Sequence, residues 1–334
     1  MGVLVNGAWI ADESTLNTSD PDGEFKRAQS SVRNWITADG SPGPSGEGGF
    51  KAEPGRYHLY WALNCPWAHR AILTRKFKGL EDLISVSATT PVRDVEGWVF
   101  DDGSETYRDH LFGSHHMHEV YTRSHPDYTG RVTVPVLWDK ERDVMVSNES
   151  SEIIRMLNSA FDDIGANDLN LYPENLRAEI DQMNDFIYHN VNNGVYRCGF
   201  ATSQAAYDQA IMDLFGALDS LDQRFGSQRY LMGDTFTEAD VRLFPSLVRF
   251  DTGYHSGFRC NKKYVAEYPN LWAYARECYQ MPGVAETVDL DIYRRGYNSM
   301  SPERNPLGII PVGPDVDFDE PVGQRPGQPA RSVA

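Results

Sequence analysis

A cysteine at the start of a predicted helix is the residue in this chain best suited to nucleophilic chemistry. Cys65 lies in the run Asn64-Cys65-Pro66-Trp67, between a predicted strand and a predicted helix. A helix N-terminus presents unpaired N–H groups and partial positive charge, which favour the thiolate form of a nearby thiol. Position 68 is alanine, so no resolving cysteine follows three residues later, and we expect an external thiol to resolve an adduct on Cys65. The alternative is an inert cysteine packed beneath the helix.

A proline within a predicted strand is the second feature. Residues 132–138 read as a strand, yet Pro135 lies inside it, where a proline is poorly tolerated. A cis Val134–Pro135 bond explains this most simply, and it would expose the Val134 backbone to a peptide-like ligand. An ordinary edge-strand proline is the alternative.

Glu149-Ser150, at the start of a further predicted helix, is the third feature. We expect Ser150 or Asn148 to cap this helix. The Ser150 hydroxyl and the first-turn N–H groups would bind a carboxylate, and the Glu149 carboxylate would bind an ammonium group. Ordinary capping is the alternative. Together with Cys65 and Val134, the pair describes a site for a thiol with an α-amino-acid end, such as glutathione.

The elements around Cys65 have the order of a βαβ unit. Residues 56–63 and 83–87 are predicted strands with a helix from residue 66 between them, which implies parallel pairing. Residues 144–146 read as a further short strand. The segment 89–130 is too long for a simple connection, so we interpret it as a functional insertion. Residues 1–54 are rich in Gly, Pro and Ser, and we interpret them as an N-terminal extension before a domain at 55–165.

The second half of the chain has a helical pattern. Apolar residues recur at helical spacing, and a capping box of Thr237 with Asp240 begins one of the helices. We therefore expect an all-α domain at residues 172–297, followed by a C-terminal coil at 298–334. The predicted helices are residues 176–190, 207–225, 236–244 and 268–280.

Composition excludes several classes of protein. The 334 residues carry 31 Lys and Arg against 48 Asp and Glu, and a net charge of −17 disfavours nucleic acid as a partner. This acidity indicates either adaptation to high salt or simply an acidic surface. We find no membrane span and no export signal, and the four cysteines are widely spaced, so we expect a cytoplasmic protein with reduced thiols.

A histidine-rich run offers candidate metal ligands. Residues 115–119 read His-His-Met-His-Glu, and imidazoles bind transition metals. No partner ligand stands at a recognised spacing from this run, so we predict an exposed loop and no metal.

The motifs above, in this order, resemble those of the glutathione transferases, which combine a thioredoxin-like α/β domain with an all-helical domain. More narrowly, residues 23–314 resemble the glutathionyl-hydroquinone reductases, the xi class. The segments that carry this narrower resemblance are residues 97–100, 130–139, 193–200, 250–254 and 308–314.

The resemblance implies a reaction and roles for particular residues. Cys65 would attack the sulfur of a glutathionyl-hydroquinone, release the hydroquinone and hold a mixed disulfide, which a second thiol removes as oxidised disulfide. Trp98 and Arg131 would hold the thiol together with Val134, Glu149 and Ser150. The hydroquinone site is implied to use Tyr196, Tyr254 and Tyr297. The family often has paired aromatic residues near the last of these, whereas this chain has Arg-Arg-Gly at 294–296.

The resemblance also implies a homodimer whose two domains form one cleft, with glutathione as co-substrate and no permanent cofactor. γ-Glutamylcysteine, which shares the recognised amino-acid end, is the alternative thiol. Two other functions remain open at this point. One is an omega-like thioltransferase or dehydroascorbate reductase, which needs Cys65 but not the tyrosines, and the other is a non-catalytic binding module.

Overall fold

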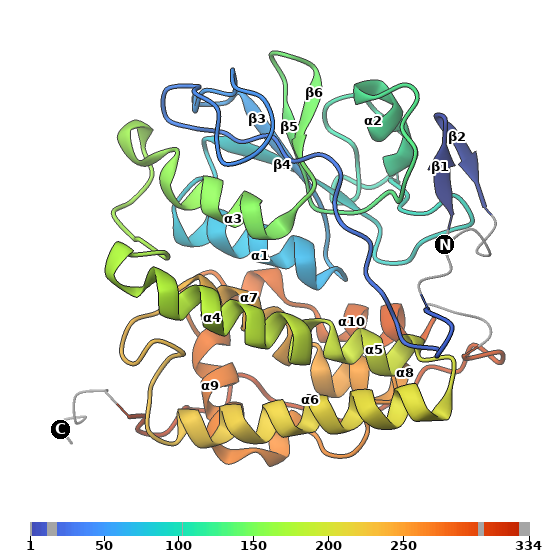
Figure 1. Cartoon of the computed structure of the whole chain (residues 1–334), viewed down its shortest axis with the longest axis vertical. Helices are drawn as coiled ribbons and strands as arrows, with labels where there is room; N and C mark the ends of the chain where they lie inside the picture. The colour runs from blue at the N-terminus through green and yellow to red at the C-terminus, as the bar shows by residue number, and fades with distance from the viewer. Residues whose placement is uncertain (1, 12–18, 102, 300–303, 327–334) are drawn as a thin grey trace. The chain divides into compact units, whose positions relative to one another are not determined.

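The computed structural model describes residues 2–11, 19–101, 103–299 and 304–326 (Figure 1). The chain divides into two compact units. Unit 1 comprises residues 1–17 and 28–170, and unit 2 comprises residues 18–27 and 171–334. The predicted N-terminal extension at 1–54 is therefore shared between the two units rather than standing apart from both.

Unit 1 is built on a mixed four-stranded sheet of order β4-β3-β5-β6. Strand β3 pairs parallel with β4, with Tyr57 opposite Ile84, and antiparallel with β5. The predicted βαβ unit is thus present, and α1 is its crossover helix. The elements of this part are β3 (Tyr57–Ala62), α1 (Pro66–Phe77), β4 (Ile84–Thr89), α2 (Met117–Ser124), β5 (Val136–Asp139), β6 (Val144–Ser147) and α3 (Ser150–Ser159).

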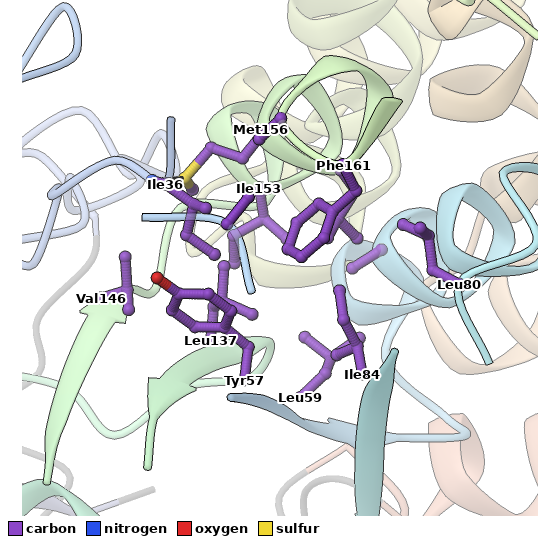
Figure 2. Packing of buried hydrophobic residues seen from close by; sticks show 14 of the residues in the cluster. Ile36, Tyr57, Leu59, Leu80, Ile84, Leu137, Val146, Ile153, Met156 and Phe161 are labelled. Atoms are coloured by element: carbon purple, nitrogen blue, oxygen red, sulfur yellow. Dashed lines mark hydrogen bonds between the residues drawn. The ribbon is translucent and has the colours of Figure 1, made fainter. Parts of the chain in front are cut away.

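Each face of the sheet has its own core. Helices α1 and α3 pack against one face, where Leu59, Ile84 and Leu137 meet Ile153 and Phe161 (Figure 2). The alternate residues of the same strands, including Tyr60 and Trp138, face a second cluster that contains Met117 and Val120 of α2. This division follows from the two-residue period of a strand, which sends successive side chains to opposite faces.

Residues before β3 belong to these cores. Ile36 and Phe50 are buried in the cluster under α1 and α3, and Ile36 lies beside Met156 (Figure 2). The chain begins with an antiparallel hairpin of β1 (Val3–Val5) and β2 (Ala8–Ile10). Its turn is Asn6-Gly7, both with positive φ, as a two-residue type I′ turn requires. The described residues 2–11 and 28–54 are therefore an integral part of unit 1.

The structure corrects three predictions about unit 1. The strand predicted at 132–138 begins only at Val136, so Pro135 precedes it and removes no hydrogen bond from the sheet. The insertion at 89–130 contains helix α2, which the irregular composition of that segment concealed. The predicted cap of α3 also needs correction, because the capping residue is Glu149.

Unit 2 is helical, as predicted. The predicted helices correspond to α4, α6, α7 and α9, and further helical segments lie between and after them. Two of these segments are π-helical turns, which widen the backbone spiral by one residue and often occur at functional sites. The principal elements are α4 (Arg177–Ile187), η4 (Tyr188–Asn192), α5 (Gly194–Phe200), α6 (Gln204–Phe225), α7 (Glu238–Leu247), η5 (Phe250–Tyr254), α8 (His255–Gly257), α9 (Pro269–Tyr279) and α10 (Leu290–Asn298).

The predicted C-terminal coil at 298–334 lies partly outside the described residues. The described stretch 304–326 contains no helix or strand. It is nevertheless packed, because Phe318 stacks edge-on against Trp272 and Arg325 pairs with Glu277. Within the part of the chain that the structure describes, none of the helices has the length and apolar character that crossing a membrane would require.

Candidate active site

Cys65 occupies the position that precedes helix α1. It is the N-cap residue, and Pro66 is the first residue of the helix. Its backbone N–H donates to Ala62 O at 2.9 Å, and its carbonyl accepts from His69 N at 3.0 Å. Only 9% of the residue is exposed, and Sγ donates to the Val134 carbonyl at 3.4 Å. The helix therefore directs its positive end toward a sulfur that stands beside Val134.

Val134 offers an unused donor next to that sulfur. Its peptide bond to Pro135 is cis, and the residue is almost fully buried. Among the described residues, the Val134 N–H donates to no acceptor. A buried N–H group without a partner is costly, so it is ready for an acceptor that a ligand brings. A peptide-like ligand bound along this edge would satisfy it.

Trp98 belongs to the same buried cluster as Cys65 and Val134. The guanidinium carbon of Arg93 lies 4.5 Å from the centre of its ring. The Trp98 carbonyl accepts from Met117 N at 2.9 Å, which ties the segment that carries Trp98 to the start of α2. The structure therefore brings together Cys65, Val134 and Trp98, which the sequence pattern placed in separate elements.

Arg131 directly follows Gly130, which the N-terminal hairpin holds in place. Gly130 exchanges backbone hydrogen bonds with Leu4, at 3.0 and 2.9 Å. Tyr128 OH donates to the Arg131 carbonyl at 3.3 Å. The hairpin at residues 3–10 thus braces the loop that carries Arg131, and the sequence analysis missed that support.

Glu149 caps helix α3 and carries a charge. Its Oε1 accepts from Ser151 N at 3.0 Å and from Ser151 Oγ at 2.7 Å, and its Oε2 accepts from Ser30 Oγ at 2.9 Å. Burial raises the pKa of Glu149, but these hydrogen bonds and the charge of Arg70 outweigh it and leave the pKa below its ordinary value. Ser150 follows as the buried first residue of α3. The pair thus offers an anionic carboxylate beside a helix N-terminus.

Ser30 is a residue of this site that the sequence analysis missed. Its hydroxyl also donates to the Asn148 carbonyl at 3.1 Å. The neighbouring backbone runs along the same edge, because Val32 N donates to Asn148 Oδ1 at 3.2 Å. Nothing in the composition of residues 28–34 distinguishes them from coil, so no local signal marks them as part of a site.

The three predicted tyrosines form one aromatic cluster in unit 2. Tyr254 OH and Tyr297 OH are 3.3 Å apart, and the Tyr196 ring centre lies 6.4 Å from that of Tyr254. Phe258 packs against all three, with ring centres between 5.2 and 5.4 Å away. Burial raises the pKa of Tyr297 well above its usual range, so its phenol stays protonated at neutral pH. Tyr196 and Tyr254 stand at or just after the π-helical turns.

Residues 19–27 of unit 2 cover Tyr196. The ring of Phe25 stacks on that of Tyr196 with centres 6.1 Å apart, and the Arg27 guanidinium lies 4.5 Å above the Tyr196 ring centre. Arg27 also donates to Asn193 Oδ1, which fixes its position. These contacts join residues about 170 positions apart in sequence, so sequence patterns could not reveal them.

Comparison with known proteins decides the family. Residues 64–160 match the family model for the glutathione S-transferase N-terminal domain, and residues 204–277 match that for the C-terminal domain. The glutathionyl-hydroquinone reductase YqjG of Escherichia coli K12 is 50% identical over 97% of this chain and 98% of its own. The glutathionyl-hydroquinone reductase PcpF of Sphingobium chlorophenolicum is 45% identical over 94% of this chain and 96% of its own. The chain belongs to the glutathionyl-hydroquinone reductases.

Solved structures of this family agree with the fold. The glutathione-bound structure of YqjG superposes with a TM-score of 0.88 at 48% identity, covering 96% of this chain and 98% of that one. The xi-class glutathione transferase of Natrialba magadii superposes with a TM-score of 0.87 at 46% identity, covering 96% and 95%. The predicted architecture, a thioredoxin-like domain followed by an all-α domain, is therefore confirmed.

Proposed function

We propose that this protein removes glutathione from glutathionyl-hydroquinones and that Cys65 is its nucleophile. The observation that carries the proposal is the position of the Cys65 sulfur, which stands at the positive end of α1 and 3.4 Å from the Val134 carbonyl. The names of the relatives that are 50% and 45% identical over nearly the whole chain support the same reaction.

The first step is attack at sulfur. The Cys65 thiolate attacks the sulfur of the conjugate, and an S–S bond forms as the bond from sulfur to the ring carbon breaks. The electron pair of the broken bond goes to that carbon, which takes a proton and leaves as the hydroquinone ring. Cys65 now holds glutathione as a mixed disulfide. The positive end of α1 stabilises the thiolate that this step consumes and the next one restores.

The second step uses a free thiol. A glutathione thiolate attacks the glutathione sulfur of the mixed disulfide, so oxidised glutathione leaves and the Cys65 thiolate returns. Two electrons pass in total from two glutathione sulfurs to the ring carbon. The absence of a cysteine three residues after Cys65 supports an external thiol in this role.

We assign the thiol site to Trp98, Arg131, Val134, Glu149 and Ser150. The free Val134 N–H would donate to the ligand's peptide backbone, and the anionic Glu149 would accept from its ammonium group. The start of α3 at Ser150 and the guanidinium of Arg131 suit carboxylates. Glutathione is the thiol we propose, and the glutathione bound in the solved YqjG structure supports this choice. γ-Glutamylcysteine would present the same amino-acid end.

We assign the hydroquinone to the tyrosine cluster. A protonated phenol can hydrogen-bond a substrate hydroxyl and pass a proton to the departing ring carbon. Tyr196 is the least buried of the three, whereas Tyr254 is fully buried and bonded to Tyr297. We therefore expect Tyr196 to contact the substrate ring, and Tyr254 and Tyr297 to form the hydrogen-bond network behind it.

The decisive experiment is the intact mass of the protein after incubation with a glutathionyl-hydroquinone. Released hydroquinone together with a glutathione-sized adduct on Cys65 supports the proposal, and Cys65→Ser should show neither. An adduct that forms only with oxidised glutathione would instead indicate a thioltransferase. No adduct and no product with either would overturn the enzymatic function, once γ-glutamylcysteine conjugates have also failed.

The rival thioltransferase is distinguished by Tyr196→Phe. The variant keeps the ring and its packing against Phe258 but loses the hydroxyl. We expect it to lose aromatic-substrate turnover about 10²-fold or more, in the range of general acid catalysis, and to keep exchange with small disulfides. Equal loss of both activities would argue against a proton-donating role for Tyr196.

We further propose that the protein works in the cytoplasm as a homodimer. The four cysteines are all free and buried in the structure, as in proteins from reducing compartments. Large apolar side chains at Leu307, Ile309 and Val312 are strongly exposed, and such side chains favour association. Light scattering tests the dimer, and Ile309→Asp combined with Val312→Asp should yield a monomer if this segment is the interface.

A further inference from the structure

Two histidines and a glutamate of unit 1 converge on one point at the surface, and we call them the histidine cluster. Its members are Glu96, His116 and His118, which each offer one ligand atom within 4.8 Å of the others. His118 Nε2 is 3.1 Å from Glu96 Oε2, and His116 Nδ1 is 3.9 Å from the same oxygen. The cluster lies outside the residues assigned to the reductase reaction.

Backbone pairing brings the cluster together. An isolated bridge joins Val99 to His116, and Met117 N donates to the Trp98 carbonyl at 2.9 Å. A second bridge closes the turn from Asp94 to Gly97, which holds Glu96 at its tip. Because Glu96 lies 20 residues before His116 in sequence, the histidine run alone showed no partner ligand at a recognised spacing.

The two imidazoles are oriented by neighbours outside the cluster. His116 Nε2 is 2.9 Å from Asp94 Oδ2, so a proton on Nε2 leaves Nδ1 with its lone pair, 3.9 Å from Glu96 Oε2 and 3.7 Å from Glu119 Oε1. A carboxylate that holds one ring nitrogen in this way is the usual support of a metal-binding histidine. The Trp9 ring stacks on His118 at 5.0 Å between centres, and the two histidine rings lie parallel at 5.2 Å.

Charge and donor type favour a cation at this point. The carboxylates of Asp94, Glu96 and Glu119 surround two imidazoles whose side chains are about 15% exposed. Two imidazole nitrogens and a carboxylate oxygen suit zinc and its transition-metal neighbours, whereas magnesium and calcium prefer oxygen ligands alone. Tetrahedral zinc holds its nitrogen and oxygen ligands about 3.4 Å apart, between the two distances measured from Glu96.

We propose that Glu96, His116 and His118 bind a divalent transition metal, with zinc as the best match and Asp94 as the positioning residue behind His116. Three protein ligands leave a fourth coordination position to water, so the site is open to solvent. The proposal does not depend on the reductase reaction, because none of these residues takes part in it.

The test is calorimetric titration of the full chain with zinc chloride in thiol-free buffer. Cys65→Ser serves as the background so that no catalytic thiolate competes for the metal. We expect one site, and we expect His116→Ala and His118→Ala each to weaken it at least tenfold. His115→Ala is the matched control, because this exposed neighbour lies outside the cluster and should leave the affinity unchanged. Unfolding curves of each variant without metal show whether the variant is folded.

Two further measurements keep the proposal falsifiable if an alanine variant fails to fold. Glu96→Gln and Asp94→Asn preserve shape, and each should weaken zinc about tenfold, as loss of a ligand or of its carboxylate support does. Nickel should quench the fluorescence of Trp9, and Trp9→Phe should abolish most of that quenching. Absence of zinc binding to the parent chain, or equal binding after His116→Ala, would overturn the proposal and leave only ion pairs between histidine and carboxylate.

Discussion

At Glu149, three hydrogen bonds outweigh the cost of burying a carboxylate. The bonds come from Ser151 and Ser30, and the result is a pKa below the ordinary value despite burial. A carboxyl group with a lowered pKa in the folded state binds its proton more weakly there than in the unfolded chain. Its contribution to stability is therefore present above an ordinary glutamate pKa of about 4.3 and disappears as the pH falls through the folded value.

Glu149→Gln should therefore change the acid branch of the stability profile. At pH 7 we expect the free energy of unfolding to fall by about 1 kcal/mol, as loss of an N-cap does. As the pH falls below about 4.3 and through the lower pKa of the folded state, the difference from the parent should shrink, because the parent carboxylate becomes protonated. Urea unfolding at a series of pH values measures this. Glu105→Gln is the control, since its side chain is 90% exposed, and a difference that stays constant with pH would contradict the argument.

The pKa of Asp240 is shifted in the opposite direction from that of Glu149. Burial raises its pKa to about 6, although Leu231 N, Thr237 N and Tyr274 OH all donate to it. The folded state therefore binds the proton more tightly than the unfolded one, so this group's contribution to stability is greatest below about pH 4 and is lost as the pH rises to 6. When the carboxylate is ionised at higher pH, it is still tolerated in the core, because its oxygens accept hydrogen bonds from these donors.

Asp240→Asn should flatten that part of the pH profile. An amide has one accepting oxygen where the carboxylate has two. One buried donor therefore loses its partner, at a cost of about 1–3 kcal/mol. We expect the variant to be less stable at every pH, and its stability should not decline between pH 4 and 6 as the parent's does. Thermal unfolding at pH 4, 5, 6 and 7 checks this. A parallel decline in both proteins would assign the effect to another group.

At the scale of elements, the capping box of α7 carries a separate prediction. Thr237 N donates to Asp240 Oδ2 at 2.9 Å, and Thr237 is itself fully buried. Thr237→Ala removes the capping hydroxyl and should lower the free energy of unfolding of unit 2 by about 1–2 kcal/mol. Hydrogen exchange of the α7 amides locates the effect. Thr237→Ser keeps the hydroxyl and should recover most of the loss, whereas a serine variant as unstable as alanine would indicate that the methyl group matters instead.

Elements with a strong local signal were predictable, and elements set by distant contacts were not. The strands β3 and β4 and the start of α1 at Pro66 follow from alternation and from proline at a helix start. The strand predicted at 132–138 began too early. Residues 132–134 favour a strand, but they lead into the cis bond at Pro135, and β5 begins only at Val136. Helix α2 was hidden by histidines and charged residues, and its burial against β6 decides its structure.

The residues of the candidate site also differ in whether the sequence alone could reveal them. Cys65, Pro135 and Glu149 were predictable because each stands at a junction between elements, where residue type alone carries information. Ser30 and Arg27 were not, since each reaches its partner across more than 100 residues of sequence. Glu96 of the histidine cluster belongs to the second group, because only the pairing of Val99 with His116 reveals it.

At the scale of the whole molecule, the N-terminal segment should prove essential to folding. Phe50 is 1% exposed and lies within the core under α1 and α3. Phe50→Ala should destabilise unit 1 by about 3–5 kcal/mol, as the loss of a buried aromatic ring does. Met212→Ala is the control, because this apolar residue of α6 is 60% exposed and should change stability by less than about 0.5 kcal/mol. Similar urea midpoints for the two variants would show that the N-terminal segment contributes little to the stability of unit 1.

The net charge of −17 makes the whole chain sensitive to salt. An excess of like charge destabilises a compact state, and salt screens this repulsion over a Debye length of about 10 Å at 0.1 M and about 3 Å at 1 M. Between about 0.05 and 0.5 M potassium chloride we expect the melting temperature at pH 7.5 to rise by roughly 3 °C or more. Near the sequence isoelectric point of about 4.9 the same salt should have little effect, because the net charge is then close to zero. A rise that continues steeply beyond 1 M, where screening is complete, would indicate adaptation to high salt. A fall with salt would show that attractive pairs such as Arg56 with Asp139 dominate over the repulsion.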